Sequence, residues 1–307
     1  MNKKNERNIV LQHYVASLVD VLGQQEALRQ LDDDEDFYNL DGTQSKETFW
    51  KGVKRCYSEV ENIRLTIQEN INRWHPSVDD ISEVSSERRL VVAEEVKHTV
   101  VTRTFSDLVL AYASLDRADT RVPIAQIWPM LCAVMFCQMN ALANGCAIRG
   151  GIELGLGFEF ANADLYGPVL SRVHSLESDV AKYPRVIVGP RLFRFVDHVA
   201  ESGLEGDFSV LNQSMARNVR RAFFRDTDGL YILDFCGAAH HEWIKADSWP
   251  AVEMYEAANN FAHEQAARFA IKGNDKLGER YRILSSYMQS RSSVWIRKSP
   301  LRAHSFL

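Results

Sequence analysis

The chain has 307 residues, of which 46% are hydrophobic, 10% are aromatic and 25% are charged, and its formal net charge is −5. This length and apolar content are sufficient for a large buried core, and they exclude a mainly disordered protein. The mild acidity argues against a protein that wraps nucleic acid, because such proteins carry a basic surface.

Predicted strands and helices alternate along residues 1–190. Runs of β-branched and apolar residues indicate the strands, whereas helical spacing of apolar residues and flanking Gly or Pro indicate the helices. The predicted strands cover residues 9–21, 96–104, 107–113, 146–153, 157–163 and 186–188. The predicted helices cover residues 24–31, 45–74, 123–144 and 168–182, and the predicted loops include the acidic run 32–36 and the polar stretch 77–89.

A tight FSD corner at residues 105–107 joins two of these strands and predicts a β-hairpin. The order of the elements, with α/β alternation and an antiparallel hairpin inside, predicts an α+β fold. We expect a ferredoxin-like βαββαβ core with extra strands, in which helices flank an antiparallel sheet.

The character of the chain changes after Pro190. Residues 223–235 predict a second hairpin with its turn at 226–229. Helices are predicted at residues 191–200, 209–220, 251–271 and 275–287. We therefore expect a catalytic domain over residues 1–190 and a C-terminal extension over 191–307, which packs on the core or on a partner subunit.

The cysteine content and the N-terminus predict the cellular compartment. The five cysteines include no CxxC pair, and no apolar secretory segment follows Met1. The most apolar stretch, residues 127–143, contains Pro129, Gln138 and Asn140 and is shorter than a spanning helix. We expect a reduced, cytoplasmic protein without membrane insertion.

Two aspartates stand out by their positions. Asp20 ends the first predicted strand, directly before a turn that contains Leu22 and Gly23, and Asp107 lies at the hairpin corner. The first strand of a ferredoxin-like sheet is central, so both carboxylates can converge at one edge. A cation such as Mg²⁺ or Mn²⁺ would neutralise them and bring phosphate, whose oxygens the N–H groups of the turn could hold. The alternative is that one aspartate caps a turn and the other closes the hairpin.

Several segments, in this order, resemble the class III nucleotidyl cyclase domain: YVASLVDVLG, TRTFSDLVLAY, GCAIRGGIELG, DLYGPVLSRVHSLE and KYPRVIV. They are most similar to the pyrimidine cyclases of the Pycsar anti-phage systems, and the likeness covers roughly residues 9–190. The resemblance implies two divalent metal ions on Asp20 and Asp107, with the carbonyl of Val21 as a further ligand. It also implies a homodimer, in which one subunit supplies the metal ligands and the other reads the base.

The base-reading positions of the family correspond to Arg103 and Asp164. Adenylate cyclases have Lys at the first position and guanylate cyclases have Glu. Arg103 offers donors and Asp164 offers acceptors, which suits the two carbonyl groups and the N3–H of uracil. The bulk of Arg favours a pyrimidine, although cytosine and adenine also combine an acceptor with a donor. The alternative for Arg103 is an exposed strand residue in a salt bridge.

The helix after Gly167 departs from the family pattern. Where the family has Asn and Arg, this chain has Ser171 and Ser175. Ser171 could still bind the sugar, but Ser175 cannot replace a guanidinium, so another cation must stabilise the charge that develops on the phosphate. The candidates are Arg149, Arg172, Lys182 and Arg185.

Other features have simpler interpretations. Tyr57, on the long predicted helix, could stack on the base, with core packing as the alternative. A group of glycines lacks the GK[ST] of a Walker sequence, so these residues are expected to permit close strand packing: Gly150, Gly151, Gly155 and Gly157. A further group resembles a zinc fragment without a fourth ligand and is expected to be structural: Cys236, His240 and His241.

These expectations combine in one functional hypothesis. The chain would be a homodimeric enzyme that converts UTP into 3′,5′-cyclic UMP and pyrophosphate by two-metal catalysis. By analogy with the family, the product would activate a separate effector protein during phage infection. The alternatives are a cytidylate cyclase, an adenylate cyclase, a non-catalytic nucleotide-binding regulator and a structural protein that uses its C-terminal helices.

Overall fold

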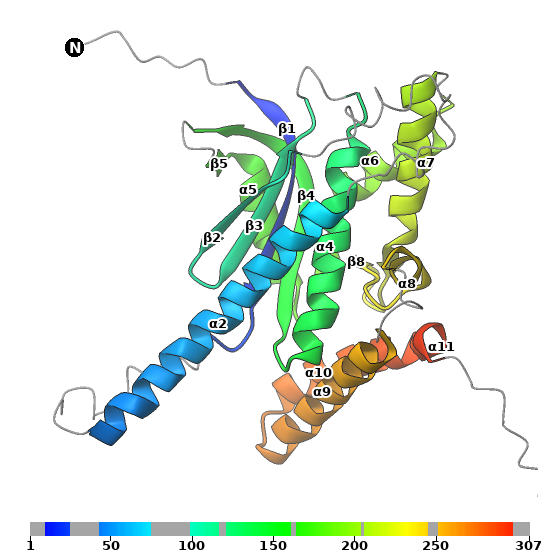
Figure 1. Cartoon of the computed structure of the whole chain (residues 1–307). Coiled ribbons are helices and arrows are strands. Elements are labelled where there is room, and N and C mark those ends of the chain that lie inside the picture. The colour runs from blue at the N-terminus through cyan, green and yellow to red at the C-terminus, as the bar shows by residue number, and fades with distance from the viewer. Residues whose placement is uncertain are drawn as a thin grey trace, which may run out of the picture.

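One sheet runs through the molecule, and helices cover both of its faces (Figure 1). The computed structural model describes residues 10–24, 43–74, 99–116, 121–160, 164–203, 206–244 and 251–296. The predicted loops at 32–36 and 77–89, and the predicted helix from residue 25 onward, lie outside these ranges.

The strands are β1 (Gln12–Val21), β2 (Val101–Phe105), β3 (Leu108–Ser114), β4 (Ile148–Glu159), β5 (Leu165–Tyr166), β6 (Val186–Val188), β7 (Phe223–Arg225) and β8 (Tyr231–Leu233). Their order in the sheet is β2-β3-β1-β4-β6-β8-β7, and β5 pairs with β4 outside this path. Only the β4–β6 pair is parallel among the described strands. The α+β class with a mixed, mostly antiparallel sheet is therefore confirmed.

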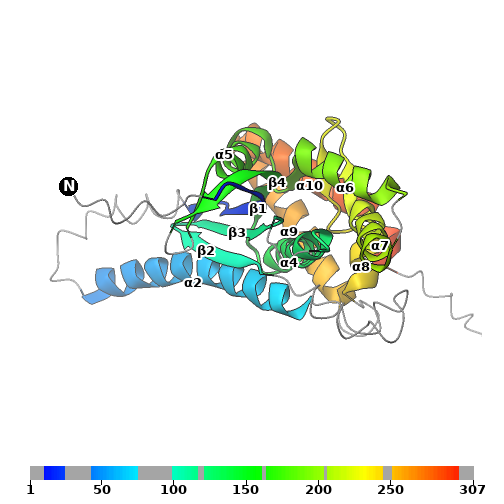
Figure 2. The same ribbon diagram turned by 90° about the horizontal axis from the view of Figure 1, so that it is seen from above.

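The helices are α2 (Thr43–Arg73), α4 (Ile124–Ala143), α5 (Pro168–Ser175), α6 (Pro190–Glu201), α7 (Asp207–Arg221), α8 (Ala238–Trp243), α9 (Ala251–Ile271), α10 (Asp275–Ser290) and α11 (Ser292–Trp295). A π-helical segment, η2 (Leu176–Val180), continues α5. Figure 2 shows α2 and α5 on opposite sides of the sheet.

Strand β1 is buried along most of its length because both of its faces are covered. Val15 and Val19 pack into the large core that includes α2 and α4, whereas Ala16 and Leu18 pack into a smaller core with α5. Alternation along the strand therefore directs Asp20 to the same face as Leu18, the face that α5 covers.

Helix α4 is the one helix among the described residues that is long and apolar enough to cross a membrane. Most of its hydrophobic window, 83%, is buried inside the protein, between the sheet and other helices. This burial is typical of a core helix and is consistent with a soluble protein.

The C-terminal region packs on the same core. The predicted hairpin is confirmed, and it extends the sheet because Ile232 of β8 pairs with Ile187 of β6. Helices α9 and α10 match the two predicted amphipathic helices, and α9 packs against α4.

Two predicted boundaries are wrong. The segments 146–153 and 157–163 were expected to be separate strands, but β4 is continuous through Gly155 and Gly157. A Cβ at Gly155 would lie 3.2 Å from Cα of Val169. This glycine therefore lets α5 pack closely on the sheet and does not mark a turn. The helix predicted over 168–182 changes to π geometry after Ser175.

Gly151 provides a test of this close packing. A Cβ at this position would lie 2.5 Å from Cβ of Leu176 and 3.0 Å from the carbonyl oxygen of Val173. We expect Gly151→Ala to lower the free energy of unfolding by about 1–3 kcal/mol, because α5 and η2 must move away from β4. Urea unfolding followed by circular dichroism measures the effect. Gly203→Ala is the control, since its Cβ would meet no described atom within 4 Å, and equal midpoints for the two variants would contradict the prediction.

Candidate functional site

Asp20 and Asp107 lie at one edge of the sheet. Asp20 pairs with Leu108, the residue that follows Asp107, and the N–H of Val21 donates to the Asp107 carbonyl oxygen at 3.3 Å. The predicted hairpin is present: Phe105 pairs with Leu108 around a two-residue turn of Ser106 and Asp107. The central position of β1 therefore brings the two aspartates together, as the sequence predicts.

Arg149 of β4 pairs with Asp20 across the sheet. Its Nε donates to Oδ2 of Asp20 at 3.0 Å, and the same atom lies 2.8 Å from Oε1 of Glu177 on η2. Because Nε carries a single N–H, which points to Asp20, Oε1 of Glu177 is buried without a hydrogen bond from the described residues. Arg149 therefore bridges two carboxylates but satisfies only one of them fully.

Burial and like charges raise the pKa values of these carboxyl groups. Desolvation raises the pKa of Asp20; Arg149 lowers it, and the charge of Asp107 raises it. Burial also raises the pKa of Glu177 to about 7, against the lowering effect of Arg149, and both the charge of Asp20 and a hydrogen bond between the two carboxyl groups raise it further. Asp20 and Glu177 thus share one guanidinium at this edge, and the charge of Asp107 lies close to both.

The oxygen atoms of Asp20, Asp107 and the Val21 carbonyl are chemically suited to a hard divalent cation. Among the described residues, however, no three His, Cys, Asp or Glu side chains are grouped as a complete metal site. Asp20 uses Arg149 as its counter-ion instead. A cation at this edge would have to compete with that guanidinium.

A cavity of about 780 Å³ lies between the β2–β3 hairpin and α5. This volume lies within the range of small-molecule sites. Its lining includes Arg103, Ser171, His174 and Ser175 over an apolar wall that contains Leu110. The cavity therefore brings together Arg103, Ser171 and Ser175, the positions that the resemblance singled out, and His174 also lines it.

The two predicted base-reading residues lie close together in the same chain. Nε of Arg103 is 3.6 Å from Oδ1 of Asp164, and their side chains are 42% and 64% exposed. At this exposure the ion pair contributes little to stability, so a ligand could separate the two groups at small cost.

The remaining predicted residues are more scattered. The N–H of Leu22 donates to the Ala147 carbonyl oxygen at 2.8 Å, so this donor is already used. Gly23 has φ +93°, and Arg172 and Lys182 are exposed. Tyr57 is 67% exposed on α2, across the sheet from α5, so the alternative of core packing is wrong. Tyr57 does not line the cavity either, and its stacking on a base stays a prediction.

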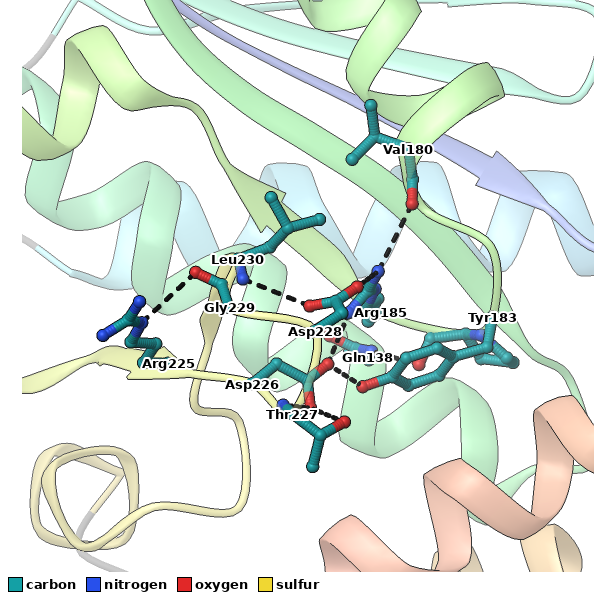
Figure 3. Close-up of polar contacts among 11 residues, drawn as sticks. Gln138, Val180, Tyr183, Arg185, Arg225, Asp226, Thr227, Asp228, Gly229 and Leu230 are labelled. Atoms are coloured by element: carbon teal, nitrogen blue, oxygen red, sulfur yellow. Dashed lines mark hydrogen bonds and ion pairs between the residues drawn. The ribbon is translucent and has the colours of Figure 1, made fainter.

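Arg185 has a structural environment. It is 2% exposed, forms an ion pair with Asp226, donates to Asp228 at 2.6 Å and lies over the ring of Tyr183 at 4.5 Å (Figure 3). It also donates to the Val180 carbonyl oxygen at 3.3 Å. The expectation that Arg185 meets the triphosphate receives no support, because the β7–β8 turn encloses its guanidinium.

The zinc-like fragment also belongs to the core. His240 is fully buried, and its Nδ1 lies 2.6 Å from the Phe235 carbonyl oxygen. Cys236 is buried too, and its carbonyl accepts from Trp295 Nε1 at 2.8 Å. These contacts agree with the structural role expected for this segment.

Sequence reasoning missed Glu177 and His174. Glu177 gives no local signal, because the π geometry of η2 changes which side chains face β4. His174 could have been identified as a candidate binding residue, because it lies between Ser171 and Ser175 on the helix.

Comparisons with known proteins identify no protein that is similar to this chain. No family model matches the chain, and neither a curated protein nor a solved structure is similar to it at a significant level. The functional argument therefore depends on the geometry and on the sequence resemblance.

Asp226→Ala tests the structural role of Arg185. The variant leaves a buried guanidinium without its buried partner, and we expect the free energy of unfolding to fall by about 3–5 kcal/mol. Chemical denaturation measures this loss. Asp197→Ala, which removes an exposed partner of Arg220, should cost no more than about 1 kcal/mol. A small loss for both variants would show that the Arg185 network is not a stabilising element.

His240 predicts a pH dependence of stability. Burial lowers its pKa to about 4 in the folded protein, whereas the unfolded chain binds this proton below about pH 6.5. The unfolded state therefore binds more protons between these pH values, and stability should decrease by up to roughly 3 kcal/mol as pH falls through this window. Thermal unfolding at several pH values should show a weaker dependence for His240→Asn, and equal slopes for this variant and the wild type would contradict the prediction.

Proposed function

We propose that the chain is a nucleotidyl cyclase that converts UTP into 3′,5′-cyclic UMP and pyrophosphate. One observation carries the proposal: Asp20 and Asp107 meet at one edge of the sheet. Arg103 lines a nucleotide-sized cavity that other residues of the chain form. The strand order β2-β3-β1-β4, with all three pairings antiparallel and a helix after β1 and after β3, supports the ferredoxin-like core that the resemblance implies.

The reaction joins two parts of the same substrate. The ribose 3′-oxygen attacks the α-phosphorus and loses its proton, and the bond from this phosphorus to the bridging oxygen breaks to release pyrophosphate. Mg²⁺ or Mn²⁺ ions, when bound, would lower the pKa of the 3′-hydroxyl and neutralise the phosphates. Asp20, Asp107 and the Val21 carbonyl would hold them, and Ser171 would bind the sugar.

Arg103 and Asp164 are proposed to select the base. The guanidinium donates to the uracil carbonyl groups, and the carboxylate accepts the N3–H. Their exposure lets a base enter between them, and the apolar wall of the cavity suits its faces. In the homodimer that the resemblance implies, these residues would read the base of a substrate whose metal ligands belong to the partner. Cyclic CMP and cyclic AMP remain the alternative products.

The missing guanidinium at Ser175 favours a second candidate function. Ser171 and Ser175 both line the cavity, where the family pattern would have Asn and Arg. Arg149, Arg172 and Lys182 remain the candidate cations for catalysis. A chain without such a cation would act as a nucleotide-binding regulator that binds triphosphate and releases no pyrophosphate.

The cellular role follows only from the resemblance. A cytoplasmic cyclase of this kind would make a second messenger for a separate effector protein during phage infection.

A panel of UTP, CTP, ATP and GTP with Mn²⁺, read by mass spectrometry, tests the proposal. We expect cyclic UMP as the main product, and Asp20→Ala or Asp107→Ala should reduce its formation roughly a thousandfold, because the metal contribution of several kcal/mol is lost. Asp197→Ala, at an exposed ion pair with Arg220, should retain activity. Cyclic AMP as the main product would reject the pyrimidine assignment, and triphosphate binding without pyrophosphate release would favour the regulator.

A further inference from the structure

We propose that Arg149 is an internal counter-ion that occupies the cation position beside Asp20 and transfers to Glu177 when a divalent cation binds. This inference rests on the proposed function, since it takes Asp20 as a metal ligand. It assigns Arg149 and Glu177 a shared positioning role at the same site.

The first argument is the geometry of the bridge. Nε of Arg149 lies 3.0 Å from Asp20 and 2.8 Å from Glu177, but it can donate its one N–H to a single acceptor. Asp20 receives this hydrogen bond. Oε1 of Glu177 is buried and receives none from the described residues. Glu177 therefore offers an unsatisfied acceptor to which the guanidinium can turn without leaving the site.

The second argument is charge. A divalent cation on Asp20 would stand within a few ångströms of the guanidinium, and two positive groups so close in a half-buried site repel strongly. Arg149 cannot simply move into solvent, because Glu177 is only 3% exposed and would then lose its ion-pair partner. If the guanidinium moves from Asp20 to Glu177, it lies farther from the cation and Glu177 keeps its ion-pair partner.

The third argument is that the backbone holds Glu177 in place. Because Gly151 has no side chain, η2 can pack closely against β4. A Cβ at Gly151 would lie 2.5 Å from Cβ of Leu176 and 3.4 Å from the Glu177 backbone nitrogen. At the other end of η2, Arg185 donates to the Val180 carbonyl oxygen, as Figure 3 shows. The second acceptor is therefore fixed before any cation arrives.

Mn²⁺ binding without nucleotide tests the proposal, measured by electron paramagnetic resonance of free Mn²⁺ on the full chain. Arg149→Gln should bind Mn²⁺ at least about tenfold more tightly than the wild type, because the competing charge is gone. Glu177→Gln should bind at least about tenfold more weakly, because Arg149 then stays on Asp20. In the Arg149→Gln background, Glu177→Gln should have a clearly smaller effect, since Glu177 acts through Arg149.

Glu177→Asp separates position from charge and covers the case in which Arg149→Gln fails to fold. It keeps the negative charge but is one methylene shorter, so we expect weaker Mn²⁺ binding despite the unchanged charge. Arg64→Gln and Glu61→Gln, at an ion pair on α2, are the matched controls and should bind Mn²⁺ as the wild type does.

These outcomes distinguish a failure of the proposed function from a failure of the counter-ion proposal alone. If neither the wild type nor Arg149→Gln binds Mn²⁺ in a way that Asp20→Asn abolishes, the metal site fails and the proposed function fails with it. If Mn²⁺ binding depends on Asp20 but Arg149→Gln and Glu177→Asp match the wild type, only the counter-ion proposal is overturned. Equal effects of Glu177→Gln in both backgrounds would also overturn it, because Glu177 would then act by its own charge.

Discussion

The arrangement of the molecule depends on the burial of β1 on both faces. This strand pairs with β3 on one side and β4 on the other, and its alternate side chains enter two separate cores. Because a shift of one residue would exchange the side chains that fill the two cores, the position of Asp20 is fixed by packing. The sheet thereby places a carboxylate against Asp107 and Arg149, and the electrostatics of the edge follow from that placement.

Features that depend on neighbouring residues could be predicted from the sequence. The FSD corner determines a two-residue hairpin, so the position of Asp107 could be inferred before the structure was known. The central place of β1 followed from the expected ferredoxin-like sheet, whose first strand is central, and together these inferences brought the two aspartates to one edge. The amphipathic helices α9 and α10 were predictable because their apolar residues repeat at helical spacing.

Features that depend on distant contacts could not be predicted. The positive charge of Arg185 suggested a phosphate ligand, but its partner Asp226 is 41 residues away in the sequence. The role of Glu177 depends on a π-helical segment that has no sequence pattern of its own. Gly155 was expected to permit close packing between strands, whereas the backbone that approaches it belongs to α5.

Helix α4 has a consequence for the way in which the chain reaches its folded state. Its side chains are buried around most of the helix, against α2 from the earlier part of the chain and against α7, α8 and α9 from the later part. During synthesis, one side of this helix stays uncovered until residues beyond 251 have emerged. A chain that ended at residue 190 would present that apolar side to water, where such surfaces promote association. The segment after residue 190 is thus needed to keep the sheet and its edge in a dispersed, folded protein.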